Sequence, residues 1–278
     1  MPANVLPLYP EAGAARPLDG LYLEQRLHEL GTARSPFVYG SFVSSLDGRI
    51  ALAEPGSPDV LEGLASSNDF RLFQELHAQA DCLITNAGYL RALAQGRLGN
   101  VLQVSAPELV EWRKQSGLAP QPAIAIASHT LDFPLHPSIA EHRQQLYVAT
   151  GRRVDPARVE ALRSGGAEII FAGDDSMVEG APLVRALSAL GYKCLYLLAG
   201  PKMLETMLRD RQLARLYLTL RHRLLGAERF HTMIEGPRLG EAGVLALRAL
   251  YLDPGDSTGV GQWFAQFDPR RDWNPLES

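Results

Sequence analysis

The sequence is poor in the features that mark several large classes of protein. It has only two cysteines in 278 residues, Cys82 and Cys194, and both lie inside apolar runs. A disulfide framework needs more cysteines in a shorter chain and a metal site needs closer spacing, so we expect buried free thiols. No apolar run approaches the ~20 residues of a membrane span. The N-terminal stretch lacks the charged start and apolar core of a signal peptide, so we expect a cytoplasmic protein with no membrane partner.

Charge and short motifs exclude further functions. The formal net charge is −4 and 21% of residues are charged, which gives no electrostatic reason to expect a nucleic-acid partner. The sequence contains no GxxxxGK[ST] phosphate loop, no HExxH, no CxxC and no GxSxG motif. Its histidines are scattered, and the six-residue spacing of His136 and His142 suits no metal pair, so we expect no metal site. The GxGxxG turn of a Rossmann fold is also missing, so a bound dinucleotide would be held in another way.

From Pro36 onward, short apolar runs alternate with amphipathic stretches. The runs are FVYGSFVS, DCLIT, AIAIAS, LYVAT, EIIFA, CLYLL and LYLTL. Such runs are typical of strands that are buried on both faces of a parallel sheet. Between them, helical patterns are predicted over residues 68–79, 106–116, 155–164, 179–190 and 201–211. The segments GVLALRALYLD and GQWFAQF read as late strands joined by loops. The pattern predicts a three-layer α/β fold whose mixed, mostly parallel sheet has an antiparallel end.

The N-terminal segment differs in composition from the rest of the chain. Residues 1–35 are predicted to be an appendage with a short helix, because Leu23, Leu27 and Leu30 mark one helical face. Asp19 is the expected cap of this helix and Gly31 its expected stop. Residues 36–278 show no internal repeat or low-complexity linker, and we expect them to form one domain.

Three small-residue turns follow predicted strands. They are Ser44–Ile50 (SSLDGRI), Thr85–Tyr89 (TNAGY) and Ala199–Leu204 (AGPKML). Each turn alone is compatible with an ordinary surface turn or a plain strand-to-helix connection. Small residues before a helix also leave backbone N–H groups open to an anion such as a phosphate. Ligands of open α/β sheets bind beyond the carboxyl ends of the strands, so the three turns together predict a nucleotide site.

These segments resemble a known family. FVYGSFVSSLDGRIAL is similar to the opening strand and SLDG turn of the reductase domain of the bacterial riboflavin-pathway deaminase–reductase. LHAQADCLITNAGYLRA, IIFAGDDSMVEGAPLVRALSALGYKCLYLLAGPKMLETML and LARLYLTLRHRLLGAERF resemble later segments of that domain in the same order. The resemblance runs from about Pro36 to about Leu252. It implies a dihydrofolate-reductase-like fold and an NADPH-dependent reductase that acts on a small molecule. It also implies a homodimer, for which the late strands are the candidate pairing segments.

On the cofactor side the family positions carry over. The resemblance places Ser44 near the nicotinamide, Gly88 in the second turn, and Ser128 near the adenosine phosphate. Tyr89 stands where the family has a threonine that contacts the cofactor. The helix start that supports the pyrophosphate corresponds to Gly200, Pro201, Lys202, Met203 and Leu204. A preference for NADPH is expected because Ser128, His129, Arg152 and Arg153 are candidate partners of the 2′-phosphate.

On the substrate side the sequence departs from the family. His77 replaces an arginine that would hold the substrate phosphate, Leu93 replaces an acidic residue, and Leu198 replaces a glutamate. Histidine cannot reproduce the bidentate clamp of an arginine at neutral pH, so we expect a divergent substrate. Asp47 and His77 are the candidate orienting or protonating residues, although Asp47 also suits the hydrogen bonds of its own turn and His77 a core histidine.

Two hypotheses from different classes therefore stand. The first is an NADPH-dependent reductase that resembles the 5-amino-6-(5-phosphoribosylamino)uracil reductase of riboflavin biosynthesis. The second is a non-catalytic dinucleotide-binding paralogue that has lost its substrate pocket. Dihydrofolate reduction is a weaker third hypothesis, because it requires a buried acid below the pterin and the sequence does not identify one.

Overall fold

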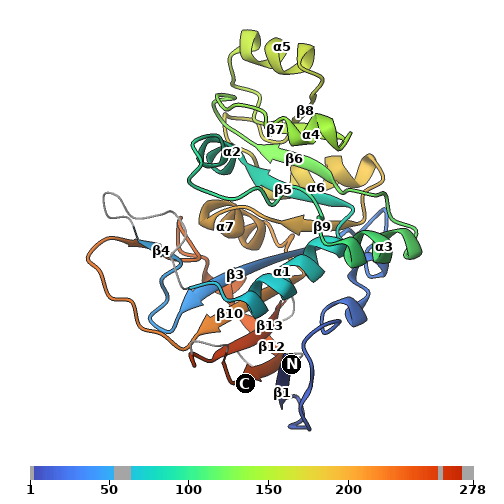
Figure 1. The fold of residues 1–278 in the computed structure, drawn as a ribbon. Coiled ribbons are helices and arrows are strands. Elements are labelled where there is room, and N and C mark those ends of the chain that lie inside the picture. The colour runs from blue at the N-terminus through green and yellow to red at the C-terminus, as the bar shows by residue number, and fades with distance from the viewer. Residues whose placement is uncertain (1–2, 53–63, 256–258, 271–278) are drawn as a thin grey trace.

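The computed structural model describes residues 3–52, 64–255 and 259–270, and within these ranges one large sheet carries helices on both faces (Figure 1). Its eleven described strands follow the order β2-β1-β12-β13-β10-β3-β9-β5-β6-β7-β8. Their bounds are β1 Asn4–Tyr9, β2 Arg16–Pro17, β3 Phe37–Ser45, β5 Cys82–Asn86, β6 Ala123–Ala127, β7 Leu146–Thr150, β8 Glu168–Phe171, β9 Cys194–Leu197, β10 Arg215–Arg221, β12 Leu245–Asp253 and β13 Gln262–Pro269. A separate two-stranded sheet pairs β4 (Ala51–Leu52) with β11 (Phe230–His231).

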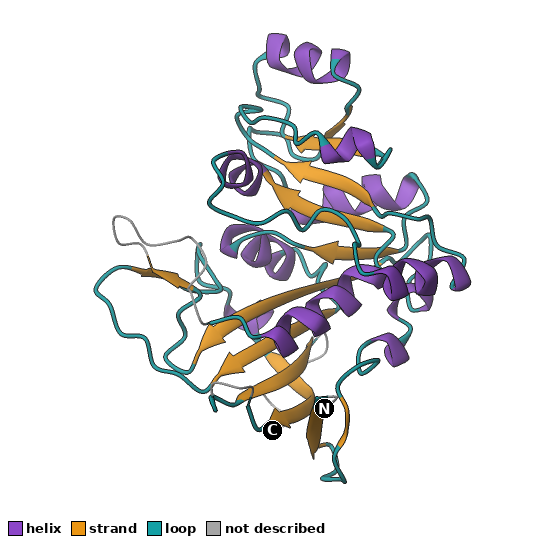
Figure 2. Ribbon diagram, viewed as in Figure 1, coloured by secondary structure: helices purple, strands orange, loops and turns teal. Residues whose placement is uncertain are grey.

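All of the strands predicted between residues 36 and 220 form, and they run parallel. Every neighbouring pair from β10 through β3, β9, β5, β6 and β7 to β8 is parallel. Parallel neighbours need crossover connections, which the intervening helices supply (Figure 2). The carboxyl ends of these strands therefore meet at one edge of the sheet.

Residues of each buried strand alternate between two apolar layers. Cys82 and Ile84 of β5 face the core cluster that contains α6 and α7, whereas Leu83 faces the cluster that contains α1. Ile124 and Ile126 of β6 pack with α2 and α5. The helices are α1 Ser67–Gln79, α2 Ala87–Ala94, α3 Pro107–Gln115, α4 Ser138–Glu141, α5 Pro156–Ser164, α6 Gly180–Ala189 and α7 Pro201–Arg209. The helix–sheet–helix arrangement confirms the predicted three-layer α/β fold.

The late strands form the antiparallel end of the sheet. β13 pairs antiparallel with β10 and β12 pairs antiparallel with β13, as the sequence predicts. Both strands have a neighbour on each side, because β12 also pairs with β1. Their edges are occupied within the chain, so β12 and β13 are not available to pair edge to edge with a second copy. The edge strands of the described sheet are β2 and β8.

The N-terminal segment is built into this end of the sheet (Figure 1). β1 is one of its strands, and Leu27 is fully buried in the core beneath α1. The predicted helix over residues 23–30 is wrong: the structure has two 3-10 turns, Leu23–Gln25 and Leu27–Glu29. Arg26 between them has a left-handed φ of 48°, which interrupts any continuous helix. Asp19 forms an ion pair with Arg71.

Buried polar side chains of α1 hold this segment in place. The carboxylate of Glu75 accepts hydrogen bonds from the backbone N–H groups of Gly20 and Tyr22, and Gln79 accepts one from Leu27 at 2.8 Å. These contacts satisfy backbone groups that would otherwise be buried without partners. Within the described ranges, no helix has the length and apolarity needed to cross a membrane.

Candidate active site

The first cleft lies at the carboxyl ends of β5, β6 and β9 and has a volume of about 310 Å³. The N-termini of α2 and α7 border it, as expected for a ligand site in an open α/β sheet. Its described lining residues are Asn86, Ala87, Gly88, Arg91, Ala127, Ser128, His129, Thr130, Met177, Val178, Gly200, Pro201, Lys202, Met203, Thr206 and Glu235.

Six of the sequence-predicted cofactor residues come together in this cleft: Gly88, Ser128, Gly200, Pro201, Lys202 and Met203. The other three lie outside its described lining. Ser44 is 1% exposed within β3. Leu204 belongs to α7, and its side chain is buried in the core. The hydroxyl of Tyr89 donates to the carbonyl of Gly99 at 3.0 Å and accepts from the N–H of Val101, so the ring turns away from the cleft.

The two helix N-termini give the first cleft its anion-binding character. The side chain of Asn86 caps α2 by accepting the N–H of Tyr89 at 2.9 Å. α7 begins with Pro201 after Gly200 and has no side-chain cap. A Cβ built on Gly200 would meet a single atom within 4 Å, Nδ2 of Asn86 at 3.9 Å. The fold therefore does not require this glycine, and the missing side chain leaves space on the cleft side.

Charged side chains reinforce this character. Two cationic residues, Arg91 and Lys202, line the first cleft. Glu235 is the one acidic residue among its described lining residues. The expectation that Arg152 and Arg153 reach a 2′-phosphate is not supported. They lie outside the described lining, at 3.8 Å from Asp174 and 3.7 Å from Asp175 respectively. Of the predicted 2′-phosphate partners, Ser128 and His129 remain at the cleft.

The second cleft lies between α1 and the strands β3, β9 and β10, with a volume of about 290 Å³. Its described lining residues are Tyr22, Ser41, Phe42, Val43, Ala65, Asp69, Phe70, Leu72, Phe73, Leu76, Val101, Leu198, Ala199, Tyr217 and Thr219. Most of them are aromatic or aliphatic, and only a few polar groups interrupt the wall. This combination is typical of small-molecule sites.

The two clefts adjoin at the carboxyl end of β9. Leu198 and Ala199 line the second cleft, and the next residues along the chain, Gly200 to Met203, line the first. A ligand that extends along the first cleft toward Gly200 would therefore end at the mouth of the second. The arrangement can bring a dinucleotide and a second molecule into contact.

Asp69, which the sequence analysis missed, is the only carboxyl group among the described residues of the second cleft. It lies in the first turn of α1, where the N-cap hydroxyl of Ser66 accepts its backbone N–H at 3.0 Å. Asp69 is partly exposed and lines the cleft. Desolvation of its carboxyl group by the surrounding protein raises the pKa of Asp69 from 3.8 to about 6, against the opposing effects of a hydrogen bond from Thr219 and the charge of Arg221.

Asp47 has the opposite environment. Its carboxylate accepts the N–H groups of Leu225 and Gly226 at 3.1 and 2.9 Å and contacts Arg49. The hydrogen bond from Ser45 and those backbone contacts lower the pKa of Asp47 to about 2. It is ionised at neutral pH, cannot donate a proton there, and ties the β3 turn to a distant loop. Gly48 next to it has a φ of 80°, which explains the glycine of the turn.

His77 lies in the core, outside the described linings of both clefts. It is 2% exposed, and its ring packs near Phe73 and Tyr196 at centroid distances of 6.0 and 6.5 Å. Burial and the positive charge of Arg113 lower its pKa to about 3, so the ring is neutral under physiological conditions. The geometry fits the alternative interpretation of His77 as a core histidine.

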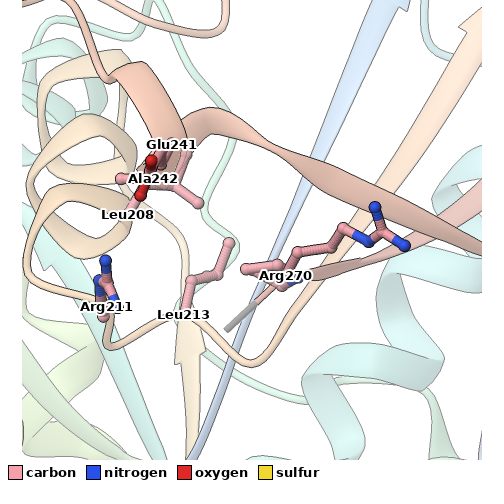
Figure 3. Close-up of a pocket in the computed structure, with 7 residues that line it drawn as sticks. Leu208, Arg211, Leu213, Glu241, Ala242 and Arg270 are labelled. Carbon is pink, nitrogen blue, oxygen red and sulfur yellow. The ribbon is translucent and has the colours of Figure 1, made fainter. Parts of the chain in front are cut away.

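A third hollow lies at the opposite edge of the sheet, before the amino end of β10 (Figure 3). It has about 30 Å³ of space and is lined by Leu208, Arg211, Leu213, Glu241, Ala242, Pro269 and Arg270. This volume is too small for a cofactor. Among the described residues, no cluster of three His, Cys, Asp or Glu side chains has the geometry to hold a metal ion.

The fold and the paired clefts define a three-layer α/β domain with two adjoining ligand-sized clefts at the carboxyl ends of its parallel strands. The chain belongs to the RibD C-terminal domain family, whose family model matches residues 36–251. No curated protein matches the chain.

Solved structures share this fold at low sequence identity. A pyrimidine reductase-like protein from Corynebacterium diphtheriae is 19% identical with a TM-score of 0.62, covering 85% of this chain and 93% of that one. RibD from Acinetobacter baumannii is 18% identical with a TM-score of 0.61, covering 85% of this chain but only 59% of that one. The riboflavin biosynthesis reductase Rib7 from Saccharomyces cerevisiae is 14% identical with a TM-score of 0.58, covering 89% and 98%. These likenesses confirm the α/β architecture predicted from the sequence.

Proposed function

We propose that the protein is an NADPH-dependent reductase that holds the dinucleotide in the first cleft and its small-molecule acceptor in the second. The observation that carries this proposal is the junction of the two clefts at residues 198–201. Hydride transfer requires the reacting carbons to approach within about 3–3.5 Å, and adjoining sites satisfy that requirement.

The residues of the first cleft fit the proposed cofactor. The N-termini of α2 and α7 point partial positive charge at the space where a pyrophosphate would lie, and Gly200 leaves room for it. Ser128 and His129 would hold the adenosine end, with Arg91 and Lys202 as the cationic partners. A bound dihydronicotinamide supplies the hydride, and the protein supplies binding, orientation and electrostatics.

The second cleft favours an enzyme over the alternative of a non-catalytic paralogue. That alternative predicts a lost substrate pocket, whereas a space of about 290 Å³ remains beside the first cleft. The replacement of a glutamate by Leu198 changes the lining of this space and leaves it open.

Cofactor binding tests the proposal directly. We expect calorimetric titration to give tighter binding of NADPH than of NADH. Gly200→Val should remove NADPH binding without unfolding the protein, because its φ of −74° suits a branched residue and only Nδ2 of Asn86 lies within 4 Å. Gly13→Val is the matched control, since Gly13 is exposed in the N-terminal segment.

Each outcome bears on a different part of the proposal. Equal or tighter binding of NADH would contradict the 2′-phosphate assignment. Unchanged NADPH affinity in folded Gly200→Val would place the cofactor elsewhere. Oxidation of NADPH with a panel of carbonyl and imine acceptors then separates an enzyme from a binding protein.

A further inference from the structure

One wall of the second cleft is an irregular segment. Residues 99–104 lie between α2 and α3, outside any helix or strand, and Val101 within them lines the cleft. Among the described residues, no backbone group of this segment forms a hydrogen bond with another backbone group. A strand is fixed by its backbone pairing, whereas the backbone groups here must bind side chains or water. The position of this wall therefore depends on the side chains that bind it.

Tyr89 binds the part of the segment that lines the second cleft. Its phenol accepts the N–H of Val101 at 2.9 Å and donates to the carbonyl of Gly99 at 3.0 Å. Burial raises the pKa of Tyr89 above its usual value, so the phenol keeps the proton that it donates. The backbone of Tyr89 lies in the first turn of α2, where its N–H binds the capping side chain of Asn86. Tyr89 therefore joins the helix that borders the first cleft to a wall of the second.

Gln121 binds the far end of the same segment. Its side chain accepts the N–H of Val104 at 2.8 Å and donates to the carbonyl of Val104 at 2.9 Å. Val104 is outside the described lining of the second cleft, in contrast to Val101. Gln121 and Tyr89 are both half-buried, and each makes two hydrogen bonds to the backbone of the segment. They differ in whether the residue that they bind lines the cleft.

A small cavity gives this wall space to move. Val101, Phe70 and Phe73 line both the second cleft and a cavity of about 20 Å³. That volume is room for about one water molecule. Side chains beside a cavity lack packing partners on that side, so packing alone does not fix Val101. The hydrogen bonds from Tyr89 are then what keeps Val101 at the second cleft.

We propose that Tyr89 is a positioning residue, which holds Val101 as the surface that orients the acceptor in the second cleft. This inference rests on the proposed reductase function. Tyr89 is outside the described linings of both clefts, so it acts on the acceptor through Val101 and leaves the dinucleotide site unchanged. A displacement of about 1 Å at an orienting contact can lower a rate by about a hundredfold.

Two matched variants test this inference. Tyr89→Phe keeps the ring and removes both hydrogen bonds to the wall, and Gln121→Leu removes two hydrogen bonds from the far end of the same segment. The first measurement is amide hydrogen exchange by NMR, which needs neither cofactor nor acceptor. We expect the Val101 amide to exchange about tenfold faster or more in Tyr89→Phe and at the native rate in Gln121→Leu.

The second measurement is steady-state turnover with NADPH. The acceptors are 4-nitrobenzaldehyde, 9,10-phenanthrenequinone and 3,4-dihydroisoquinoline, which are aromatic as the largely apolar lining of the second cleft requires. In Tyr89→Phe we expect the KM of the acceptor to rise about fivefold or more, with the KM of NADPH within about twofold of the native value. In Gln121→Leu both constants should stay within about twofold, although urea unfolding should show a similar loss of stability in the two variants.

Several results would overturn the inference. Native exchange of the Val101 amide in Tyr89→Phe would show that the phenol does not hold the wall. An equal rise of the acceptor KM in Gln121→Leu would reduce the role of Tyr89 to general stability, and an equal rise of the NADPH KM in Tyr89→Phe would make it a cofactor residue. Turnover of none of the acceptors by the native protein would contradict the proposed function itself. Normal turnover with an unchanged acceptor KM in Tyr89→Phe would contradict the inference alone, so the two failures are distinguishable.

Discussion

The buried carboxyl of Asp69 should make the protein less stable at neutral pH than its Asp69→Asn variant. Folding raises the pKa of Asp69 from 3.8 to about 6. Between these values the folded protein retains a proton that the unfolded chain has released, so stability falls as pH rises through this window. At about 1.4 kcal/mol per pKa unit, the full shift corresponds to roughly 3 kcal/mol of lost stability above pH 6.

Asparagine removes the charge while keeping a carbonyl oxygen that can accept the Thr219 hydroxyl. The variant and the native protein should therefore be similar in stability near about pH 4, and the variant should be more stable by up to about 3 kcal/mol near about pH 8. Urea unfolding at both pH values measures the difference, and Asp174→Asn is the control. A stability difference that does not grow with pH would refute the assignment of Asp69 as a carboxyl with a raised pKa.

Three other variants test the structural framework. Arg113→Ala should destabilise the protein by about 3 kcal/mol or more in urea unfolding, because its buried guanidinium donates to the carbonyls of Ala78, Ala80 and Ala119. Leu27→Ala should cost about 2–5 kcal/mol, because this fully buried side chain fills the core beneath α1; a neutral effect would mean that the N-terminal segment folds apart from the sheet. Asp47→Asn should lower the melting temperature at neutral pH, and the difference from the native protein should disappear as pH falls toward 2, because the depressed pKa of Asp47 stabilises the fold only while the carboxylate is ionised.

Hydrophobic periodicity was enough to predict the parallel half of the sheet. Each apolar run between residues 36 and 220 became a strand, because strands covered on both faces are mostly apolar. The N-terminal segment was harder to predict. β1 has the sequence NVLPLY, with a proline that is uncommon inside strands, and its pairing with β12 joins residues far apart in the chain. The spacing of Leu23, Leu27 and Leu30 gives no indication of the left-handed Arg26 between them.

The sequence predicts the residues of the candidate site that lie in strand-to-helix turns, but not the acid of the second cleft. Turns such as Ala199–Leu204 carry a local signal, because small residues at a helix start are visible in the sequence. Asp69 carries no such signal. An acidic residue in the first turn of a helix is ordinary, since it interacts favourably with the helix dipole, and the groups that act on its carboxyl, Thr219 and Arg221, come from β10, far along the chain. The dihydrofolate-reduction hypothesis requires an acid near the substrate, and the sequence alone did not identify Asp69 as a candidate for it.

The geometry of α1 explains why Asp69 and not His77 reaches the second cleft. Residues 69, 72, 73 and 76 follow the i, i+3, i+4, i+7 spacing of one helix face, and all four line the cleft. His77 lies about 100° further around the helix, where it and Leu109 of α3 line the same small cavity. Leu198 therefore extends the apolar wall of the second cleft, whereas His77 lies outside the described lining of that cleft. The raised pKa of Asp69 costs stability at neutral pH, and a perturbed pKa beside a cleft is a common feature of functional residues.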